Sequence, residues 1–99
     1  MISDPHAALR TRAVESVLDG PALTSSSLRH AAAERAELPP ELRPLIDKIH
    51  NHAYRVTNED ITRLQATYSD DQLFEIIVSA ALGASGHRLA AGLRALEEA

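Results

Sequence analysis

The stretch SDDQLFEIIVSAALGASG, residues 69–86, decides the fold of this chain. Its first four letters, S-x-x-Q, form a capping box, which signals the start of a helix. The following residues, 73–83, are apolar on almost every side of that helix, and a helix without a polar face is buried on most sides. We therefore expect this helix at the centre of a small domain or shared with a second subunit. The glycines at its end, in residues 83–86, predict a hinge, a kink or a point of close packing.

Helix signals divide the rest of the chain as well, and no segment has the alternation of a β-strand. A cap and a proline at residues 3–5 start a first helix, and Gly20-Pro21 ends it. A second, Ala-rich helix runs from caps at residues 24–27 to about Ala36. Further helices are lined by Leu42, Leu45, Ile46, Ile49 and Ala53, then by Ile61 and Leu64 after the Thr57 cap, and finally by Leu89, Leu93 and Leu96.

These signals predict a single all-α domain of five or six helices over residues 1–99. The second helix is weakly apolar, so we expect residues 1–37 to form peripheral N-terminal helices and residues 38–99 to form the core. Aromatic residues make up only 3% of the chain, so Leu, Ile, Val and Ala must build that core. Small side chains allow helices to approach closely, and Ala also has the highest helix propensity.

Composition excludes several classes of function. The formal net charge is −4, whereas a nucleic-acid binder normally has a basic patch on a basic domain. The chain has no cysteine, so it has no disulfide, no thiolate nucleophile and no thiolate metal site. The first ten residues lack the pattern of a secretory signal, and the longest apolar run, residues 74–85, is shorter than the roughly 20 residues of a membrane span. We therefore expect a soluble cytoplasmic protein that binds neither nucleic acid nor membrane.

Residues 50–54, HNHAY, gather polar side chains that invite a metal-site interpretation. His50 and His52 are two residues apart, which places them about 200° apart on a helix, so one ion cannot easily bind both. We predict no metal site and no cofactor. The simpler interpretation is the last turn of a helix, where histidine suits the helix dipole and Tyr54 packs at the rim. His52 and Tyr54 remain candidate catalytic residues.

Three more candidate catalytic residues follow, Glu75, His87 and Arg88. Glu75 stands one turn into the apolar helix, where a buried carboxylate would have a raised pKa and act as a general acid or base. The alternative, which we favour, is that Glu75 pairs with an arginine such as Arg88 or one of a neighbouring subunit. His87-Arg88 follows the glycines and suits either an anion site or, as we prefer, an exposed or interface-facing element.

The order of these pieces is similar to a known family. Residues 56–93 resemble the C-terminal helical part of the alkylhydroperoxidase D-like/carboxymuconolactone decarboxylase-like superfamily. A V-T-x-x-D helix start leads there to an S-D-x-x-L start, a long apolar helix and an R-L-x-x-G-L ending. The matching residues are Val56, Thr57, Asp60, Leu64, Ser69, Asp70, Leu73, Arg88, Leu89, Gly92 and Leu93.

The resemblance implies an all-α fold that assembles into homo-oligomers through the apolar helix. It also implies a limit on chemistry. The peroxidase members act through a Cys-x-x-Cys pair, and this chain has no cysteine, so we do not expect thiol peroxidase activity. A non-redox, decarboxylase-like activity stays open.

Two hypotheses of function follow. In the first, the chain is a non-redox oligomeric scaffold or accessory protein with an unidentified protein partner. In the second, it is a non-redox enzyme or binding protein for a small carboxylated or lactone-like molecule at a subunit interface, using Glu75, His52 or His87-Arg88. The absence of cysteine and of a convergent acid–base pair favours the first.

Overall fold

The computed structural model describes residues 7–98, and these form helices joined by short connections. The α-helices are α1 (Ala7–Asp19), α2 (Ser26–Glu34), α3 (Arg43–His52), α4 (Asn58–Leu64) and α5 (Asp70–Glu98). Two 3-10 helices, η1 (Pro40–Leu42) and η2 (Ala53–Arg55), precede and follow α3. No strand occurs within residues 7–98, so the all-α prediction is confirmed. The cap predicted at residues 3–5 lies outside the described residues.

The caps that the sequence predicted form as reciprocal hydrogen bonds. The Ser69 backbone N–H donates to Oε1 of Gln72 at 2.8 Å, and the Gln72 N–H donates to Oγ of Ser69 at 3.1 Å. Thr57 and Asp60 make the same exchange at the start of α4. Each cap satisfies backbone N–H groups that the first turn of a helix leaves unpaired. Local sequence therefore sets where α4 and α5 begin.

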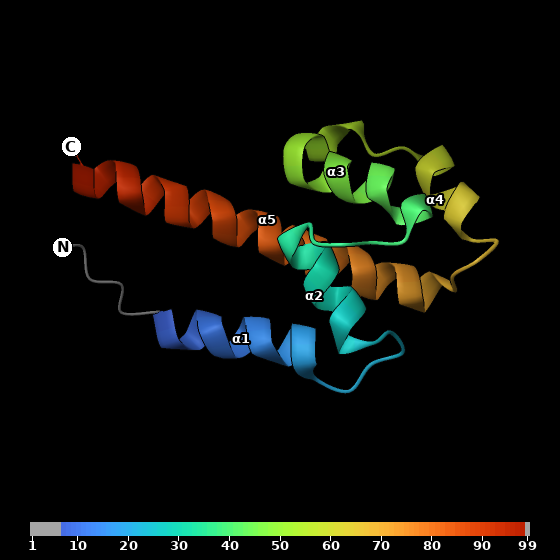
Figure 1. Cartoon of the computed structure of the whole chain (residues 1–99), viewed down its shortest axis with the longest axis horizontal. Helices are drawn as coiled ribbons and strands as arrows, with labels where there is room; N and C mark the ends of the chain where they lie inside the picture. The colour runs from blue at the N-terminus through green and yellow to red at the C-terminus, as the bar shows by residue number, and fades with distance from the viewer. Residues whose placement is uncertain (1–6, 99) are drawn as a thin grey trace.

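The core lies between α2, α3 and the first half of α5, which runs the length of the molecule (Figure 1). Leu42, Ile46 and Ile76 are fully buried there, and Leu64 closes the end beneath α4. Tyr68, half-buried, packs at the same end and donates a hydrogen bond to Glu41 at 2.8 Å. Aliphatic side chains thus fill the core, as the composition indicated.

The helices α2 and α5 meet through their backbones, at Gly83. A Cβ added at Gly83 would lie only 1.9 Å from the carbonyl oxygen of Ala33, so no side chain fits between the two helices at this point. Ala32 and Ala33 on α2, and Ala80 and Ala84 on α5, are all buried around it. The close packing predicted for residues 83–86 is therefore found at Gly83.

Two expectations differ from the structure at this contact. No hinge or break occurs at the glycines, because α5 continues as one helix of 29 residues. The second helix, α2, is not peripheral, since it crosses α5 and buries Ala32 and Ala33 completely or nearly so. Its alanines give a weak apolar face in sequence, but their small size is what lets two backbones come together.

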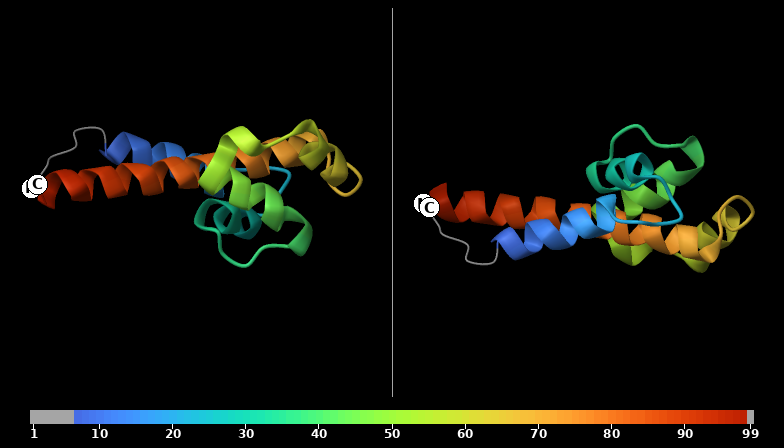
Figure 2. Two further views of the ribbon diagram at one scale, coloured as in Figure 1. Left: turned by 90° about the horizontal axis from the view of Figure 1, so that it is seen from above. Right: turned by 90° about the horizontal axis from the view of Figure 1, so that it is seen from below.

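The second half of α5 and α1 form an extension, here named the arm, made of residues 7–19 and 85–98. From residue 85 to residue 98 no side chain of α5 is buried, and within α1 only Leu18 is. Figure 2 shows the two helices side by side from opposite directions. The arm leaves Leu9, Leu89 and Leu96 exposed by 61%, 40% and 62%. The arm thus carries three of the exposed large hydrophobic side chains of the described residues, and Leu23, Tyr54 and Phe74 are exposed elsewhere.

The continuity of α5 gives a longer apolar helix than the sequence analysis expected. By length and composition, α5 is the one helix among residues 7–98 that could cross a membrane. Core helices of soluble proteins pass the same test when they are mostly buried, but only 22% of the most apolar 18-residue window of α5 is buried. The sequence analysis ended the apolar run at Ser85, whereas in the structure the same helix continues beyond that residue.

The contact at Gly83 gives a first prediction. In an ordinary exposed helix, Gly→Ala stabilises by about 1 kcal/mol. Here Gly83→Ala should destabilise by about 2 kcal/mol, because the added methyl overlaps the Ala33 carbonyl and forces the two helices apart. The measurement is urea unfolding followed by circular dichroism.

The matched control is Ala81→Gly, an exposed position two residues earlier on the same helix. This variant should lose about 1 kcal/mol from helix propensity alone. If Gly83→Ala instead gained that amount, the close contact between α2 and α5 would be disproved.

Candidate functional site

Asp60 is the most completely bonded ionisable side chain in the described fold. Its carboxylate is 5% exposed and receives two hydrogen bonds from Nζ of Lys48, at 2.8 and 3.0 Å. Arg63 donates at 2.9 Å and the Thr57 backbone N–H at 2.9 Å. These donors, Lys48 first and then Thr57, lower the pKa of Asp60 to about 2. Asp60 therefore stays ionised at neutral pH and ties α3 to α4.

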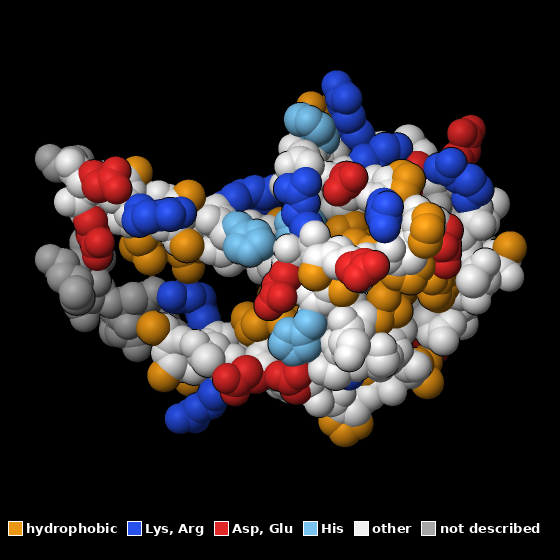
Figure 3. Space-filling model, viewed as in Figure 1, with side chains coloured by type: hydrophobic (Ala, Val, Ile, Leu, Met, Phe, Trp, Pro, Cys, Tyr) orange, Lys and Arg blue, Asp and Glu red, His pale blue; other side chains and the backbone are white. Residues whose placement is uncertain are grey.

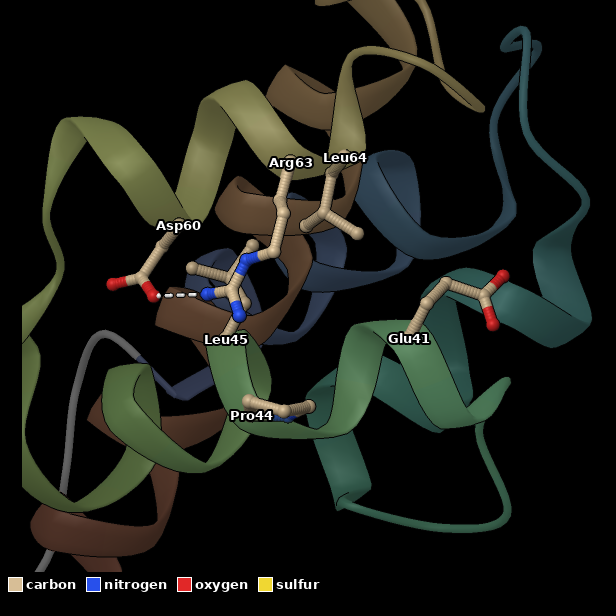
Figure 4. Close-up of a pocket in the computed structure, with 6 residues that line it drawn as sticks. All are labelled: Glu41, Pro44, Leu45, Asp60, Arg63 and Leu64. Carbon is tan, nitrogen blue, oxygen red and sulfur yellow. Dashed lines mark hydrogen bonds and ion pairs between the residues drawn. The ribbon is translucent and has the colours of Figure 1, made fainter.

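A shallow pocket lies beside this carboxylate (Figure 4). Its volume is about 220 Å³, and its lining comprises Glu41, Pro44, Leu45, Asp60, Arg63 and Leu64. The guanidinium of Arg63 reaches across the pocket toward Asp60, while Glu41 points away from both (Figure 4). Glu41 instead accepts the hydrogen bond of Tyr68, and burial together with that carboxylate raises the pKa of Tyr68 to about 12. The pocket thus offers no free acid or base near neutrality.

Glu75 anchors the loop between α1 and α2. Its carboxylate accepts hydrogen bonds from the backbone N–H groups of Leu23 and Thr24, at 2.9 and 2.8 Å, and from Oγ1 of Thr24 at 2.7 Å. The Leu23 bond, followed by the Thr24 hydroxyl, lowers the pKa of Glu75. The interpretation as a buried general acid with a raised pKa is therefore wrong. Arg88 does not pair with Glu75, because its guanidinium donates to the His50 carbonyl, and pairing with an arginine of a neighbouring subunit stays a prediction.

Arg88 and His87 meet the end of α3 at His50. Arg88 donates to the backbone carbonyl of His50 at 3.1 Å, and the His87 ring lies 5.9 Å from the His50 ring. Nε2 of His50 is 2.9 Å from the carbonyl oxygen of Ala32 on α2. Burial, and then the nearby positive charges, lower the pKa of His50. This junction joins α2, α3 and α5, and it is structural in its contacts.

His52 and Tyr54 lie outside that junction, on the exposed turn that ends α3. Their rings are 5.9 Å apart, and the Arg55 guanidinium lies 5.9 Å from the Tyr54 ring. Tyr54 is 81% exposed. An open surface depression of about 370 Å³ passes His52, lined by Asp47, Lys48, Asn51, His52 and Arg55. The five candidate catalytic residues therefore do not converge on one site. His87 and Arg88 meet His50, His52 and Tyr54 lie together on the exposed turn, and Glu75 lies at the loop between α1 and α2.

Arg29 is a structural residue that the sequence reading missed. It is 4% exposed and donates to the carbonyl oxygens of Val17 and Gly20, so it closes the C-terminal end of α1. A cation suits this end of a helix, where unpaired carbonyls gather. Its Nε has no hydrogen-bond partner. Within residues 7–98, no three His, Asp or Glu side chains come together as a metal site.

A third opening, of about 200 Å³, lies between the two helices of the arm. Its lining comprises Arg10, Ala13 and Val14 from α1 and Leu82, Ser85, Gly86 and Leu89 from α5. Hydrophobic side chains run along the side of the α5 arm that faces α1 (Figure 3). This cleft is the most apolar of the openings described, and it continues into the exposed leucines of the arm. It is the feature of the molecule best suited to contact with another apolar surface.

No family model, curated protein or solved structure matches this chain significantly. The fold and its sites define a small all-α protein whose Asp60 and Glu75 carboxylates bond internally and whose arm carries exposed leucines. Membership of the alkylhydroperoxidase D-like/carboxymuconolactone decarboxylase-like superfamily stays a prediction from the sequence.

The Asp60 network predicts a specific dependence of stability on pH. A carboxyl whose pKa falls from 3.8 to about 2 on folding stabilises the protein above about pH 4, and this stabilisation is lost as the pH drops toward 2. Asp60→Asn should lower the free energy of unfolding at pH 7 and make its fall between pH 4 and 2 shallower. Urea unfolding at a series of pH values measures both effects.

Glu59→Gln is the matched control, because Glu59 is an exposed carboxylate in the same first turn of α4. It should leave the free energy of unfolding close to that of the wild type. Part of the acid slope remains in either variant, since the pKa values of Asp19 and Glu75 are also lowered. An acid slope that is identical in Asp60→Asn and wild type would contradict the role given to Lys48 and Thr57.

Proposed function

We propose that this chain is a non-redox helical protein that works as a homo-oligomeric scaffold or accessory protein. The observation that carries the proposal is the arm. It consists of two helices whose apolar residues face each other across an open cleft and are left uncovered by the rest of the described fold.

The energetics of the arm support assembly. Most helical stability in proteins comes from packing of an apolar face, and residues 85–98 of α5 have little burial to stabilise them. Fully burying a leucine contributes about 1.5–3 kcal/mol. Covering Leu9, Leu89 and Leu96 would therefore contribute on the order of 1 kcal/mol each in every copy, given their exposed fractions. Helices of two copies packed side by side would form a bundle with a shared core.

The polar sites give less support to catalysis. A general acid or base needs a pKa near the working pH. The pKa values of Asp60 and Glu75 are lowered, and that of Tyr68 is raised to about 12, so all three move away from neutrality. The alternative function, binding or converting a small carboxylated or lactone-like molecule at a subunit interface, would use Glu75, His52 or His87-Arg88. Glu75 is already bonded to Leu23 and Thr24, and Arg88 to the His50 carbonyl.

Oligomeric state tests the proposal directly. Light scattering after size exclusion should show wild-type assembly at micromolar concentration. Leu89→Glu and Leu96→Glu should each shift the protein to monomer, because a charge in the covered surface cannot be solvated. Circular dichroism would confirm that both variants remain helical.

Phe74→Glu is the matched control, since Phe74 is 67% exposed on the same helix but lies outside the arm. It should leave the assembly intact. A well-folded wild-type monomer at micromolar concentration would contradict the proposal. Flotation with phospholipid vesicles separates a further case: a monomer that floats with the vesicles would make the arm a membrane anchor instead.

A further inference from the structure

Two histidine rings lie near each other where the end of α3 meets α5. The centroids of the His50 and His87 rings are 5.9 Å apart, and His50 is half-buried, whereas His87 is exposed. Nε2 of His50 lies 2.9 Å from the carbonyl oxygen of Ala32, which can only accept a hydrogen bond. Nε2 of the neutral ring therefore carries the proton, and Nδ1 is the atom that gains a proton when the pH falls.

Positive charges approach the His50 ring from both helices packed against α3. From α5, Arg88 donates to the His50 backbone carbonyl at 3.1 Å, one residue after His87. From the end of α2, Arg35 reaches α3, where its guanidinium lies 3.6 Å from the carboxylate of Asp47. The Asp47 side chain is 62% exposed, so water weakens its effect on the ring. A proton added to His50 thus meets two arginines and a second histidine.

Arg35 stands at this junction in an unfavourable backbone conformation. It is the C-cap of α2, and its φ of 56° and ψ of 36° lie in the left-handed region that favours glycine. It is the one non-glycine residue with positive φ within residues 7–98. Its side chain also donates to Oδ1 of Asn51 on α3, at 3.4 Å. The contacts with α3 therefore hold this positive charge beside the end of that helix.

The folded structure opposes protonation of His50. Burial is the main cause, and it lowers the pKa of the ring. The hydrogen bond to the Ala32 carbonyl offsets part of this effect, and the neighbouring cations lower the pKa further. In the unfolded chain the ring takes up a proton near its ordinary pKa of 6.5. As the pH falls below about 6.5, the unfolded chain therefore binds a proton that the folded chain does not, and stability is lost.

We propose that His50 and His87 form an acid-sensitive junction, which holds the end of α3 against α2 and α5 at neutral pH and loosens in mildly acidic solution. Protonated rings repel each other and the two arginines, so the contact between α3 and α5 weakens. His87 and Arg88 belong to the arm, so the arm loses a link to the core. This inference goes beyond the proposed oligomer and is independent of it, because every contact that it uses lies within one chain.

Nuclear magnetic resonance of the wild-type protein tests the junction before any substitution. His50 should take up its proton at a lower pH in the folded protein than in the protein unfolded by urea. Arg88→Gln removes one neighbouring charge and should move the His50 titration to higher pH. Arg94→Gln, an exposed position on the same helix, is the matched control and should leave it unchanged. A His50 that titrates at the same or a higher pH in the folded protein would overturn the proposal.

Urea unfolding gives a second readout, between about pH 7.5 and pH 5.5. His50→Gln keeps a donor for the Ala32 carbonyl but cannot titrate, so the wild type should lose stability relative to this variant as the pH falls. For one proton the loss approaches at most about tenfold in the unfolding equilibrium constant per pH unit. His52→Gln, on the exposed turn, is the matched control and should keep the wild-type slope. Equal slopes in His50→Gln and wild type would contradict the junction.

Hydrogen exchange locates the loosening. After correction for the intrinsic rates, amides at the end of α3 and in residues 84–91 of α5 should lose protection in the wild type at about pH 5.5. In His50→Gln the same amides should stay protected. A loss spread evenly over all helices of the wild type would mean a change in global stability alone and would overturn the local junction.

Discussion

The backbone contact between α2 and α5 at Gly83 is the constraint on which the rest of this small fold depends. Because Gly83 has no side chain, the Ala33 carbonyl lies directly against α5, and the alanines on both helices are buried around it. The other elements then attach to α2. Arg29 of α2 closes the end of α1, and the carbonyl of Ala32 bonds to His50 at the end of α3. A short helix with Leu28 as its one large apolar side chain thus organises the packing of α1, α3 and α5.

Two charged side chains, Glu75 and Asp60, complete this frame through hydrogen bonds. Glu75 holds the loop before α2, and Asp60 joins α3 to α4 through Lys48. Carboxylates that accept several hydrogen bonds favour their ionised form, so their pKa values fall. A site that must exchange protons near neutrality needs the opposite environment. The Asp60 and Glu75 carboxylates therefore serve the architecture of the fold.

The sequence predicted what short-range chemistry determines. Capping boxes at Thr57 and Ser69 and the apolar face of α3 depend on residues a few positions apart, and they formed as expected. The failures involve partners far away in the chain. Glu75 bonds to residues 51 and 52 positions earlier, and Gly83 is explained only by Ala33, so neither could be assigned from local spacing. The Ala-rich α2 was misjudged for the same reason, since close backbone approach leaves little apolar pattern in sequence.

The two halves of α5 use the same kind of residue in different settings. In the first half, small and aliphatic side chains are covered by α2 and α3. In the second half, the described residues add α1, set across an open cleft, and the His50 end of α3. Lipid would cover this surface less well than protein, because Arg88, Arg94, Glu97 and Glu98 all stand on the same 14-residue segment, and a charge in the centre of a bilayer is costly. This segment has apolar side chains on one side and charged side chains on the other. It is therefore amphipathic, and its apolar side favours contact with another helix. Under the proposed function, a partner helix would cover this apolar side of the arm.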